Sequence, residues 1–262
     1  LNPDCFNKEL LEEFYDLGFS RCTVGVQTLN KHILDTLNRS HSIDTAYNSL
    51  EILKNSPFKS NFGVDFIQGL PNQTIDSVLS DIDYVSNFAP HISVYMLTLE
   101  KNTPLYNKFI SHYSTNQYSD DVAEMFIETH KLLNSKGYNH YEVSSYAKND
   151  IISNNTKNQS NHNNLYWKGE EFLGFGVSAA GFVNNTLTRN PLQLKKYYNY
   201  VNTLVDIAKS NLNNEDRTER DTLKKHTGNA FFSLINCGNY SREVELLDRD
   251  QRLKLYLMNR LR

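Results

Sequence analysis

The stretch from Asn61 to Thr74, NFGVDFIQGLPNQT, limits the possible folds of this chain more strongly than any other. Its short apolar run stops at a Gly-Leu-Pro sequence, and a run of this length bounded by glycine and proline predicts a buried β-strand. After Thr74 the apolar residues recur at helical spacing, which predicts an amphipathic helix. Asp65 lies inside the strand, where an unpaired charge is costly. It is therefore either a structural hydrogen-bond hub or a ligand contact near the strand's carboxyl end, where α/β folds place their sites.

The first two-thirds of the chain repeats this alternation of strand and helix patterns. Strands are predicted at residues 22–27, 63–67 and 91–99, with a possible fourth at 141–146. Helices are predicted at residues 8–17, 30–37, 43–53, after Thr74 and at 120–135. This rhythm indicates parallel βα units, arranged as an open sheet or as part of a barrel.

The last third of the chain has a different pattern. Residues 149–164 are rich in Asn and Ser and predict a loop. Beyond Pro191 an apolar stripe at helical spacing, a polar linker near residues 211–220 and a last helix from Asp248 predict a separate small helical domain. We therefore expect two domains, at residues 1–190 and 191–262.

Composition excludes several classes of protein. A formal net charge of -3 gives no general basic field, which argues against nucleic acid as a partner. The longest nearly uncharged stretch, residues 173–183, is too short to span a bilayer. The three cysteines, Cys5, Cys22 and Cys237, contain no Cys-x-x-Cys pair, which argues against a disulfide framework and against a zinc or cluster motif within this span.

Polar residues at the predicted strand ends are candidates for a binding site. Gln27, Asp65, Gln68 and Glu100 would share one rim of the sheet, where loops converge in parallel barrels. For Gln68 a structural role is favoured, and for Gln27 and Asp65 the two readings are balanced. Elsewhere, Arg39 could reach an anion at this rim but is more simply a solvated surface residue. His41 is expected to be an exposed loop residue.

Among the eight histidines, His162 is the strongest candidate for a ligand of a metal or of heme iron. Tyr166 and Trp167 follow it and could stack on a porphyrin face. A lone histidine beside aromatic residues is, however, more often a hydrogen-bonded packing residue. Chemistry alone favours that second interpretation.

Several strings, taken together and in order, resemble one family. They are Gly25-Val-Gln27 with Arg39-Ser-His41, Val64-Asp-Phe-Ile-Gln-Gly-Leu-Pro-Asn-Gln-Thr74, His91-Ile-Ser-Val-Tyr with Leu97-Thr-Leu-Glu-Lys-Asn-Thr-Pro104, Tyr141-Glu-Val-Ser144, and His162-Asn with Tyr166-Trp167 and Leu173-Gly-Phe-Gly176. The chain is similar to the radical S-adenosylmethionine (SAM) family that contains oxygen-independent coproporphyrinogen III oxidase and the HemW-type heme chaperones. The strings at Thr98–Pro104, Tyr141–Ser144 and His162–Trp167 resemble the chaperone branch.

The resemblance implies a partial (β/α)6 radical SAM barrel lacking its first strands, followed by a small, mainly helical C-terminal domain. By position, Gln27, Arg39 and Asp65 match residues that contact SAM, and His162 becomes a candidate heme contact with Tyr166 and Trp167 as packing partners. Implied cofactors are SAM, a [4Fe-4S] cluster and heme. Implied partners are heme and a heme-accepting protein. The alternative function is that of the oxidase, so whether the protein is an enzyme stays open.

One departure from the family is the cysteine motif that binds the cluster. No Cys-x-x-x-Cys-x-x-Cys string occurs in this sequence, and the resemblance places it upstream of Leu1. We therefore expect a fragment that begins near the end of the third barrel strand and that alone lacks the cluster. The resemblance implies a cytoplasmic protein, with the mitochondrial matrix as the alternative.

Overall fold

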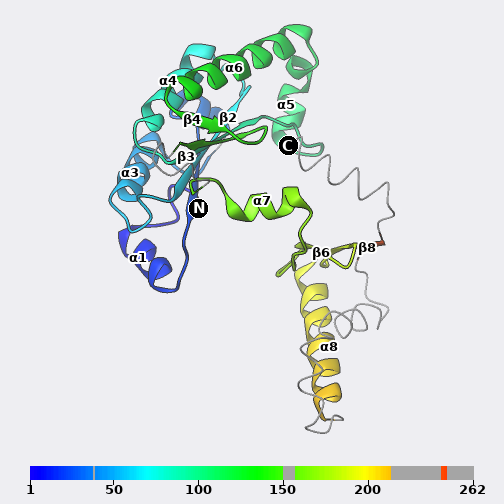
Figure 1. The fold of residues 1–262 in the computed structure, drawn as a ribbon. Helices are drawn as coiled ribbons and strands as arrows, with labels where there is room; N and C mark the ends of the chain where they lie inside the picture. Colours follow the sequence, from blue (N-terminus) through cyan, green and yellow to red (C-terminus); the bar gives the residue numbers. More distant parts are fainter. Residues whose placement is uncertain (38, 150–156, 214–242, 247–262) are drawn as a thin grey trace. The chain divides into compact units, whose positions relative to one another are not determined.

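The computed structural model of the chain describes residues 1–37, 39–149, 157–213 and 243–246 (Figure 1). Within these residues the chain divides into two compact units, one ending at Ser160 and the other beginning at Asn161. The segment 161–190 thus groups with the second unit. The predicted domain boundary after residue 190 remains a prediction.

The first unit is built on a five-stranded sheet with the strand order β1-β2-β3-β5-β4. Its first three strands are parallel: β1 (Cys22–Gln27), β2 (Phe62–Gln68) and β3 (His91–Met96). The short strands β4 (Tyr138–His140) and β5 (Ser145–Lys148) form an antiparallel hairpin, and β5 pairs with β3. The predicted α/β fold with parallel βα units is confirmed.

The possible fourth strand at residues 141–146 is wrong in its bounds. Residues 141–144 instead form the turn between β4 and β5, in which the backbone N–H of Tyr141 donates to the carbonyl of Ser145 at 3.2 Å. This reversal lets β5 run antiparallel to β3, with Ala147 opposite His91. The β-forming residues of this stretch indicated extended chain, but they carried no information about where the direction changes.

Six helices belong to the described part of the first unit. They are α1 (Lys8–Asp16), α2 (Lys31–Thr36), α3 (Ile43–Lys54), α4 (Ile75–Ser86), α5 (Pro104–Tyr113) and α6 (Asn116–Ser135). Five of them begin beside a side-chain oxygen that accepts a backbone N–H of the first turn, supplied by Asn7, Asn30, Ser42, Thr74 and Thr115. Helix α5 was not predicted, although proline is favoured at a first helical position such as that of Pro104.

The strand register separates an apolar face of the sheet from a polar one. Val24, Val64 and Ile92 stand side by side on β1, β2 and β3, and all three are buried in the main hydrophobic core. Residues from α3, α4 and α6 complete this core. Because successive side chains of a strand point to opposite faces, the next row, Gly25, Asp65 and Ser93, lies on the other face.

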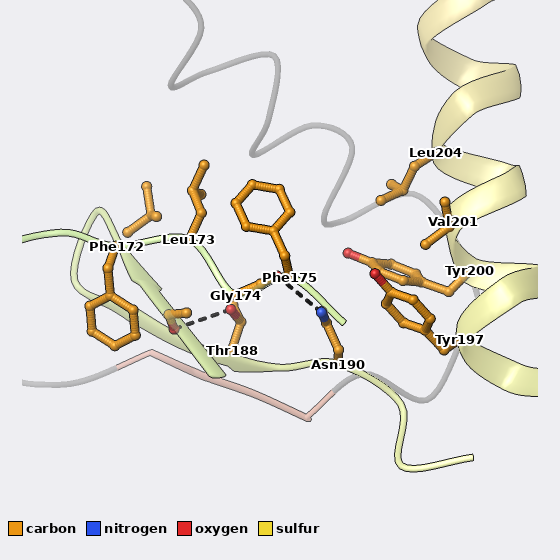
Figure 2. Close-up of a pocket in the computed structure, with 12 residues that line it drawn as sticks. Phe172, Leu173, Gly174, Phe175, Thr188, Asn190, Tyr197, Tyr200, Val201 and Leu204 are labelled. Atoms are coloured by element: carbon orange, nitrogen blue, oxygen red, sulfur yellow. Dashed lines mark hydrogen bonds between the residues drawn. The ribbon is translucent and has the colours of Figure 1, made fainter. Parts of the chain in front are cut away.

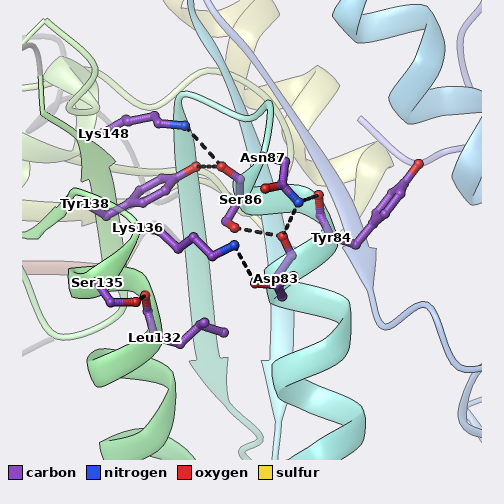
Figure 3. Close-up of polar contacts among 9 residues, drawn as sticks. All are labelled: Asp83, Tyr84, Ser86, Asn87, Leu132, Ser135, Lys136, Tyr138 and Lys148. Carbon is purple, nitrogen blue, oxygen red and sulfur yellow. Dashed lines mark hydrogen bonds and ion pairs between the residues drawn. The ribbon is translucent and has the colours of Figure 1, made fainter.

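The carboxyl end of α4 is held by contacts from α6 and the hairpin (Figure 3). The Tyr138 hydroxyl donates to the carbonyls of Ser86, at 3.1 Å, and Ala89. Lys148 Nζ donates to the same Ser86 carbonyl at 3.1 Å. These donors satisfy carbonyls that a helix end leaves without partners, and they fix α4 against the edge of the sheet.

The described part of the second unit combines helices with a small sheet. Its elements are α7 (Asn161–Lys168), β6 (Ala180–Val183), β7 (Thr186–Arg189), α8 (Leu194–Asn213) and β8 (Glu243–Leu246). The strands are antiparallel in the order β6-β7-β8, and Asn184 and Asn185, both with positive φ, form the tight turn between β6 and β7.

Two predictions for the second unit are only partly covered. Helix α8 runs to Asn213, so the predicted polar linker begins inside a helix, and its remainder lies outside the described residues. The predicted last helix from Asp248 also lies outside them. No described helix combines the length and the apolar character needed to cross a membrane.

Candidate functional site

The carboxyl end of β1 is distorted so that Gln27 turns back over Gly25. Gln27 has a φ of 72°, and the pairing of β1 with β2 shifts between Gly25 and Gln27. The Gln27 Nε2 atom lies 2.7 Å from the position that a β-carbon on Gly25 would occupy. Any side chain at position 25 would therefore force this amide to move, and the left-handed backbone of Gln27, a non-glycine residue, marks a place held by its surroundings.

Helix α4 fixes the segment that follows Gln27. The Asp81 carboxylate accepts hydrogen bonds from the Thr28 hydroxyl and the Leu29 backbone N–H, both at 2.8 Å. Burial raises the pKa of Asp81, while these two donors act in the opposite direction. A carboxylate on α4 thus anchors the backbone immediately beyond the distorted end of β1.

Arg39 reaches the same point of the sheet from the loop after α2. Its Nη2 donates to the Gly25 carbonyl at 3.5 Å and lies 3.8 Å from the would-be β-carbon of Gly25. The neighbouring His41 is buried, at 5% exposure, so its predicted exposure is wrong. Burial, followed by the positive charge of Arg39, lowers the pKa of His41.

Asp65 is the register partner of Gly25 on β2 and of Ser93 on β3. Its Oδ1 atom is buried and accepts no hydrogen bond from the described residues. Burial raises the pKa of Asp65 to about 6, although a hydrogen bond with Ser93 and nearby positive charges act to lower it. An acceptor left open in such a place is suited to a ligand that donates a hydroxyl or amine proton.

The structure therefore brings Gln27, Arg39 and Asp65 to one place, around the Gly25–Asp65 pair. The other two rim candidates lie elsewhere. Gln68 is fully buried, and its Oε1 accepts from the Thr129 hydroxyl at 3.5 Å, in agreement with a structural role. Glu100 is exposed in the loop beyond β3.

A polar group that the sequence did not single out lies on the same sheet face, at the amino ends of the strands. His91 Nε2 and the Tyr141 hydroxyl are 2.7 Å apart, and that hydroxyl also accepts from the Ser160 backbone N–H at 3.0 Å. Arg21 Nη1 donates to Asn61 Oδ1 at 2.9 Å. Burial lowers the pKa of His91 to about 3, so its ring is neutral in the folded protein. Arg21 precedes its strand, and only its alternation with Thr23 could have signalled this position.

The residues around Gly25 suit the predicted SAM. Arg39 can pair with a carboxylate, Gln27 can both donate and accept, and the unpaired oxygen of Asp65 can accept from a ribose hydroxyl. The assignment of these roles remains a prediction. What the structure adds is that Gln27 and Arg39 both lie beside the side-chain position of Gly25, the register partner of Asp65.

The described cysteines do not suit a [4Fe-4S] cluster. Cys5 is exposed and Cys22 is half-buried, and burial raises the pKa of Cys22 to about 11, whereas cluster ligands are thiolates. No group of three or more His, Cys, Asp or Glu side chains among the described residues could hold a metal ion. Cys237 lies outside the described residues.

The three predicted heme contacts lie on α7. His162 and Tyr166 are one turn apart, with His162 Nε2 2.9 Å from the Tyr166 hydroxyl and the rings edge to face at 4.7 Å between centroids. His162 is exposed, while Tyr166 and Trp167 are half-buried. If Nε2–H donates to the tyrosine oxygen, the lone pair of Nδ1 is left for iron, and metal-binding histidines are commonly oriented by such a second hydrogen bond.

A family model described as the radical SAM superfamily matches residues 1–85 of this chain. That range contains Gln27, Arg39 and Asp65, and it includes the strands β1 and β2. The match therefore covers the segment in which the structure gathers the predicted SAM contacts.

Curated relatives match beyond this range. The chain is 30% identical over 243 residues to a protein of Lactococcus lactis named heme chaperone HemW, covering 90% of this chain and 62% of the relative. It is 35% identical over 181 residues to the HemW of Buchnera aphidicola from Schizaphis graminum, covering 69% of this chain and 45% of that protein. A zebrafish (Danio rerio) protein named radical S-adenosyl methionine domain-containing protein 1, mitochondrial, is 32% identical over 185 residues, with 69% and 39% covered.

A solved structure shares the fold. Coproporphyrinogen III oxidase (HemN) from Escherichia coli, described as a radical SAM enzyme, superposes with a TM-score of 0.64 at 18% sequence identity. The match covers all of this chain and 54% of that one. The chain thus spans about half the length of the proteins it matches.

Proposed function

Since this chain belongs to the radical SAM superfamily and is similar to curated heme chaperones, we propose that it binds heme for transfer to acceptor proteins. One observation carries the proposal. The similarity to the Lactococcus HemW extends over 90% of the chain, so it runs through α7, which holds His162. Because the chain spans only part of these relatives, the function of the whole protein belongs to the proposal.

In this proposal His162 is the iron ligand. Its exposure leaves the ring open to a large planar ligand, and its contact with the Tyr166 hydroxyl holds the imidazole in one orientation. Orientation by a second hydrogen bond strengthens a histidine ligand. Trp167 follows on the same helix and supplies an aromatic surface for contact with the macrocycle.

We further propose that Gln27, Arg39 and Asp65 hold SAM at the Gly25–Asp65 pair. SAM supplies radical chemistry when a reduced cluster is bound beside it, and the described residues provide no ligands for that cluster. The part assigned to this chain is to bind and orient. Arg39 fixes the negative end of the ligand, and Asp65 accepts from its hydroxyl groups.

No observation favours the oxidase over the chaperone. The likeness to HemN rests on 18% identity and supports the shared fold. Cytoplasm is the compartment we propose for the chain, with the mitochondrial matrix as the alternative because one relative is named mitochondrial.

Titration of the chain with ferric heme tests the proposal. Binding is expected to shift the Soret band and quench the fluorescence of Trp167, the single tryptophan. His162→Ala should abolish the spectrum of the imidazole-bound iron. His32→Ala, which removes an exposed histidine from α2, should leave it unchanged. A chain that binds no heme, or a His162→Ala variant with the wild-type spectrum, refutes the site.

A further inference from the structure

The second unit contains an apolar cavity of about 210 Å³ between the loop at residues 172–175, the hairpin β6–β7 and α8 (Figure 2). Twelve described residues line it, and none carries a charge. Leu173 and Phe175 at the cavity are more than half exposed, which adds further apolar surface. Exposed apolar surface beside a cavity indicates a place where an apolar ligand binds.

The polar side chains that line the cavity are engaged in shaping it. Asn190 Nδ2 donates to the carbonyls of Gly174 at 3.0 Å and Gly176 at 2.9 Å, and the Tyr197 hydroxyl accepts from the Gly176 N–H at 3.0 Å. Gly174 packs so tightly that a β-carbon on it would lie 2.2 Å from the Ala180 carbonyl oxygen. These hydrogen bonds and this close packing hold the loop in place, so the cavity is a defined feature of the second unit.

Two aromatic contacts connect this cavity to the proposed heme ligand. The Tyr166 ring lies edge to face with the rings of both His162 and Phe172, with centroid distances of 4.7 Å and 4.5 Å. Phe172 itself lines the cavity. All of these residues belong to the same compact unit, so the cavity begins one aromatic ring beyond the partner of His162.

We propose that this cavity takes the vinyl- and methyl-bearing edge of the heme whose iron is held by His162. This inference rests on the proposed function. Pockets that enclose a whole drug-sized ligand measure about 300–1,000 Å³, so a smaller cavity takes part of a macrocycle. Its lining has no positive charge to pair with propionates, which selects the apolar edge and leaves the carboxylates in solvent.

The test compares matched substitutions on α8 in the 262-residue chain. Val201 lines the cavity, whereas Val205, one turn further on, is 43% exposed and does not line it. Val201→Asp is expected to weaken binding of iron-free protoporphyrin IX at least about tenfold, because it buries a carboxylate against the apolar edge. Val205→Asp should stay within about twofold of the wild type. Quenching of Trp167 fluorescence by protoporphyrin IX measures the affinity of each variant.

A second ligand and a second variant separate the possible outcomes. Deuteroporphyrin IX, which lacks the vinyl groups, should bind the wild type several-fold more weakly than protoporphyrin IX, by about the transfer free energy of the missing carbons. Val201→Phe fills the cavity without adding charge and should remove this preference. If Val201→Asp does not fold, as judged by circular dichroism, the Val201→Phe comparison decides.

Equal porphyrin affinity in the wild type and the cavity variants, with heme binding that still depends on His162, overturns the cavity assignment but leaves the proposed function intact. Failure of the wild-type chain to bind any of these porphyrins overturns both. Loss of the iron spectrum in His162→Ala with protoporphyrin IX binding retained supports both sites.

Discussion

Gly25 and Asp65 stand opposite each other on β1 and β2, and the Gln27 amide occupies the space that a side chain on Gly25 would need. This relationship explains how residues far apart in the sequence meet. The Arg39 guanidinium donates to the carbonyl of the same glycine, so the Gln27 amide and the Arg39 guanidinium both lie beside Gly25. The carboxylate of Asp65 beside it has a buried oxygen that accepts no hydrogen bond from any described residue.

Gly25→Ala should destabilise the chain through its clash with the Gln27 amide. We expect a loss of about 1 kcal/mol in the free energy of unfolding, at the low end of the usual cost of overpacking, because the clashing atom is the end of a flexible side chain that can move. In a Gln27→Ala background the same substitution should cost much less, because the clashing group is gone. Urea denaturation of the four proteins measures this coupling. Strictly additive costs would show that the two side chains do not compete for space.

The pH dependence of stability should contain two opposing contributions from the polar sheet face. The folded pKa of Asp65, about 6, is above its ordinary value, so its contribution is fully present below about pH 4 and is lost as the pH rises through about 6. The folded pKa of His91, about 3, is below its ordinary value, so its contribution is present above about pH 6.5 and is lost as the pH falls towards 3.

Asp65→Asn should remove the contribution of Asp65 to the pH dependence of stability and leave that of His91 in place. Between about pH 4 and pH 6.5, the stability of this variant should rise with pH more steeply than that of the wild type, by an amount on the order of 2 kcal/mol. Thermal or urea unfolding across this range measures the difference. Exposed Asp76→Asn is the control and should follow the wild-type curve. Parallel curves for Asp65→Asn and the wild type would rule out a raised pKa at Asp65.

Tyr138→Phe should destabilise the first unit by about 1–2 kcal/mol, because it removes the donor to the carbonyls at the end of α4. Lys148 continues to donate to Ser86, which limits the loss. Tyr84→Phe, at a position of 38% exposure on α4, is the matched control and should change the stability by less than about 0.5 kcal/mol. Chemical denaturation separates the two cases. Equal effects would mean that the Tyr138 hydroxyl has no role in holding α4.

Tyr166→Phe should weaken heme binding about tenfold while preserving the aromatic contact with Phe172. The hydroxyl that orients His162 is lost, and second-sphere partners of metal ligands typically contribute about 10–100-fold to affinity, the smaller value being expected for an exposed site. Soret titration measures this change. Tyr198→Phe, exposed on α8, should bind heme as the wild type does. A Tyr166→Phe variant of unchanged affinity and spectrum would show that the hydroxyl does not orient the ligand.

The elements with strong periodicity could be predicted from the sequence. The strands at Cys22–Gln27 and Phe62–Gln68 and the helix after Thr74 lie within a residue or two of their predicted positions, because apolar pattern and capping residues agree there. Strand ends together with the family resemblance also indicated one binding site for Gln27, Arg39 and Asp65, and that site remains a prediction. Their roles as ligands remain predictions.

Other features depend on tertiary contacts that a local pattern does not encode. The hairpin turn at residues 141–144 arises because β5 pairs with β3, and α7 begins at Asn161, in the last residues of the loop predicted at 149–164. Burial of His41 was missed because an isolated polar residue after Arg39 gives no periodic signal. The left-handed backbone of Gln27 likewise had no sequence marker, since glycine is the residue usually found there.

The short reach of the hairpin determines how open the first unit is. Strand β5 pairs with only the first half of β3, from His91 to Ser93, and Tyr95 and Met96 at the other end of β3 are 40% and 48% exposed. Among the described residues, no strand therefore pairs with Tyr95 and Met96 on the side of β3 where β5 lies. A ligand too broad to enter a closed barrel could bind from this side of the sheet. The surrounding loops, rather than a closed ring of strands, would then limit its size.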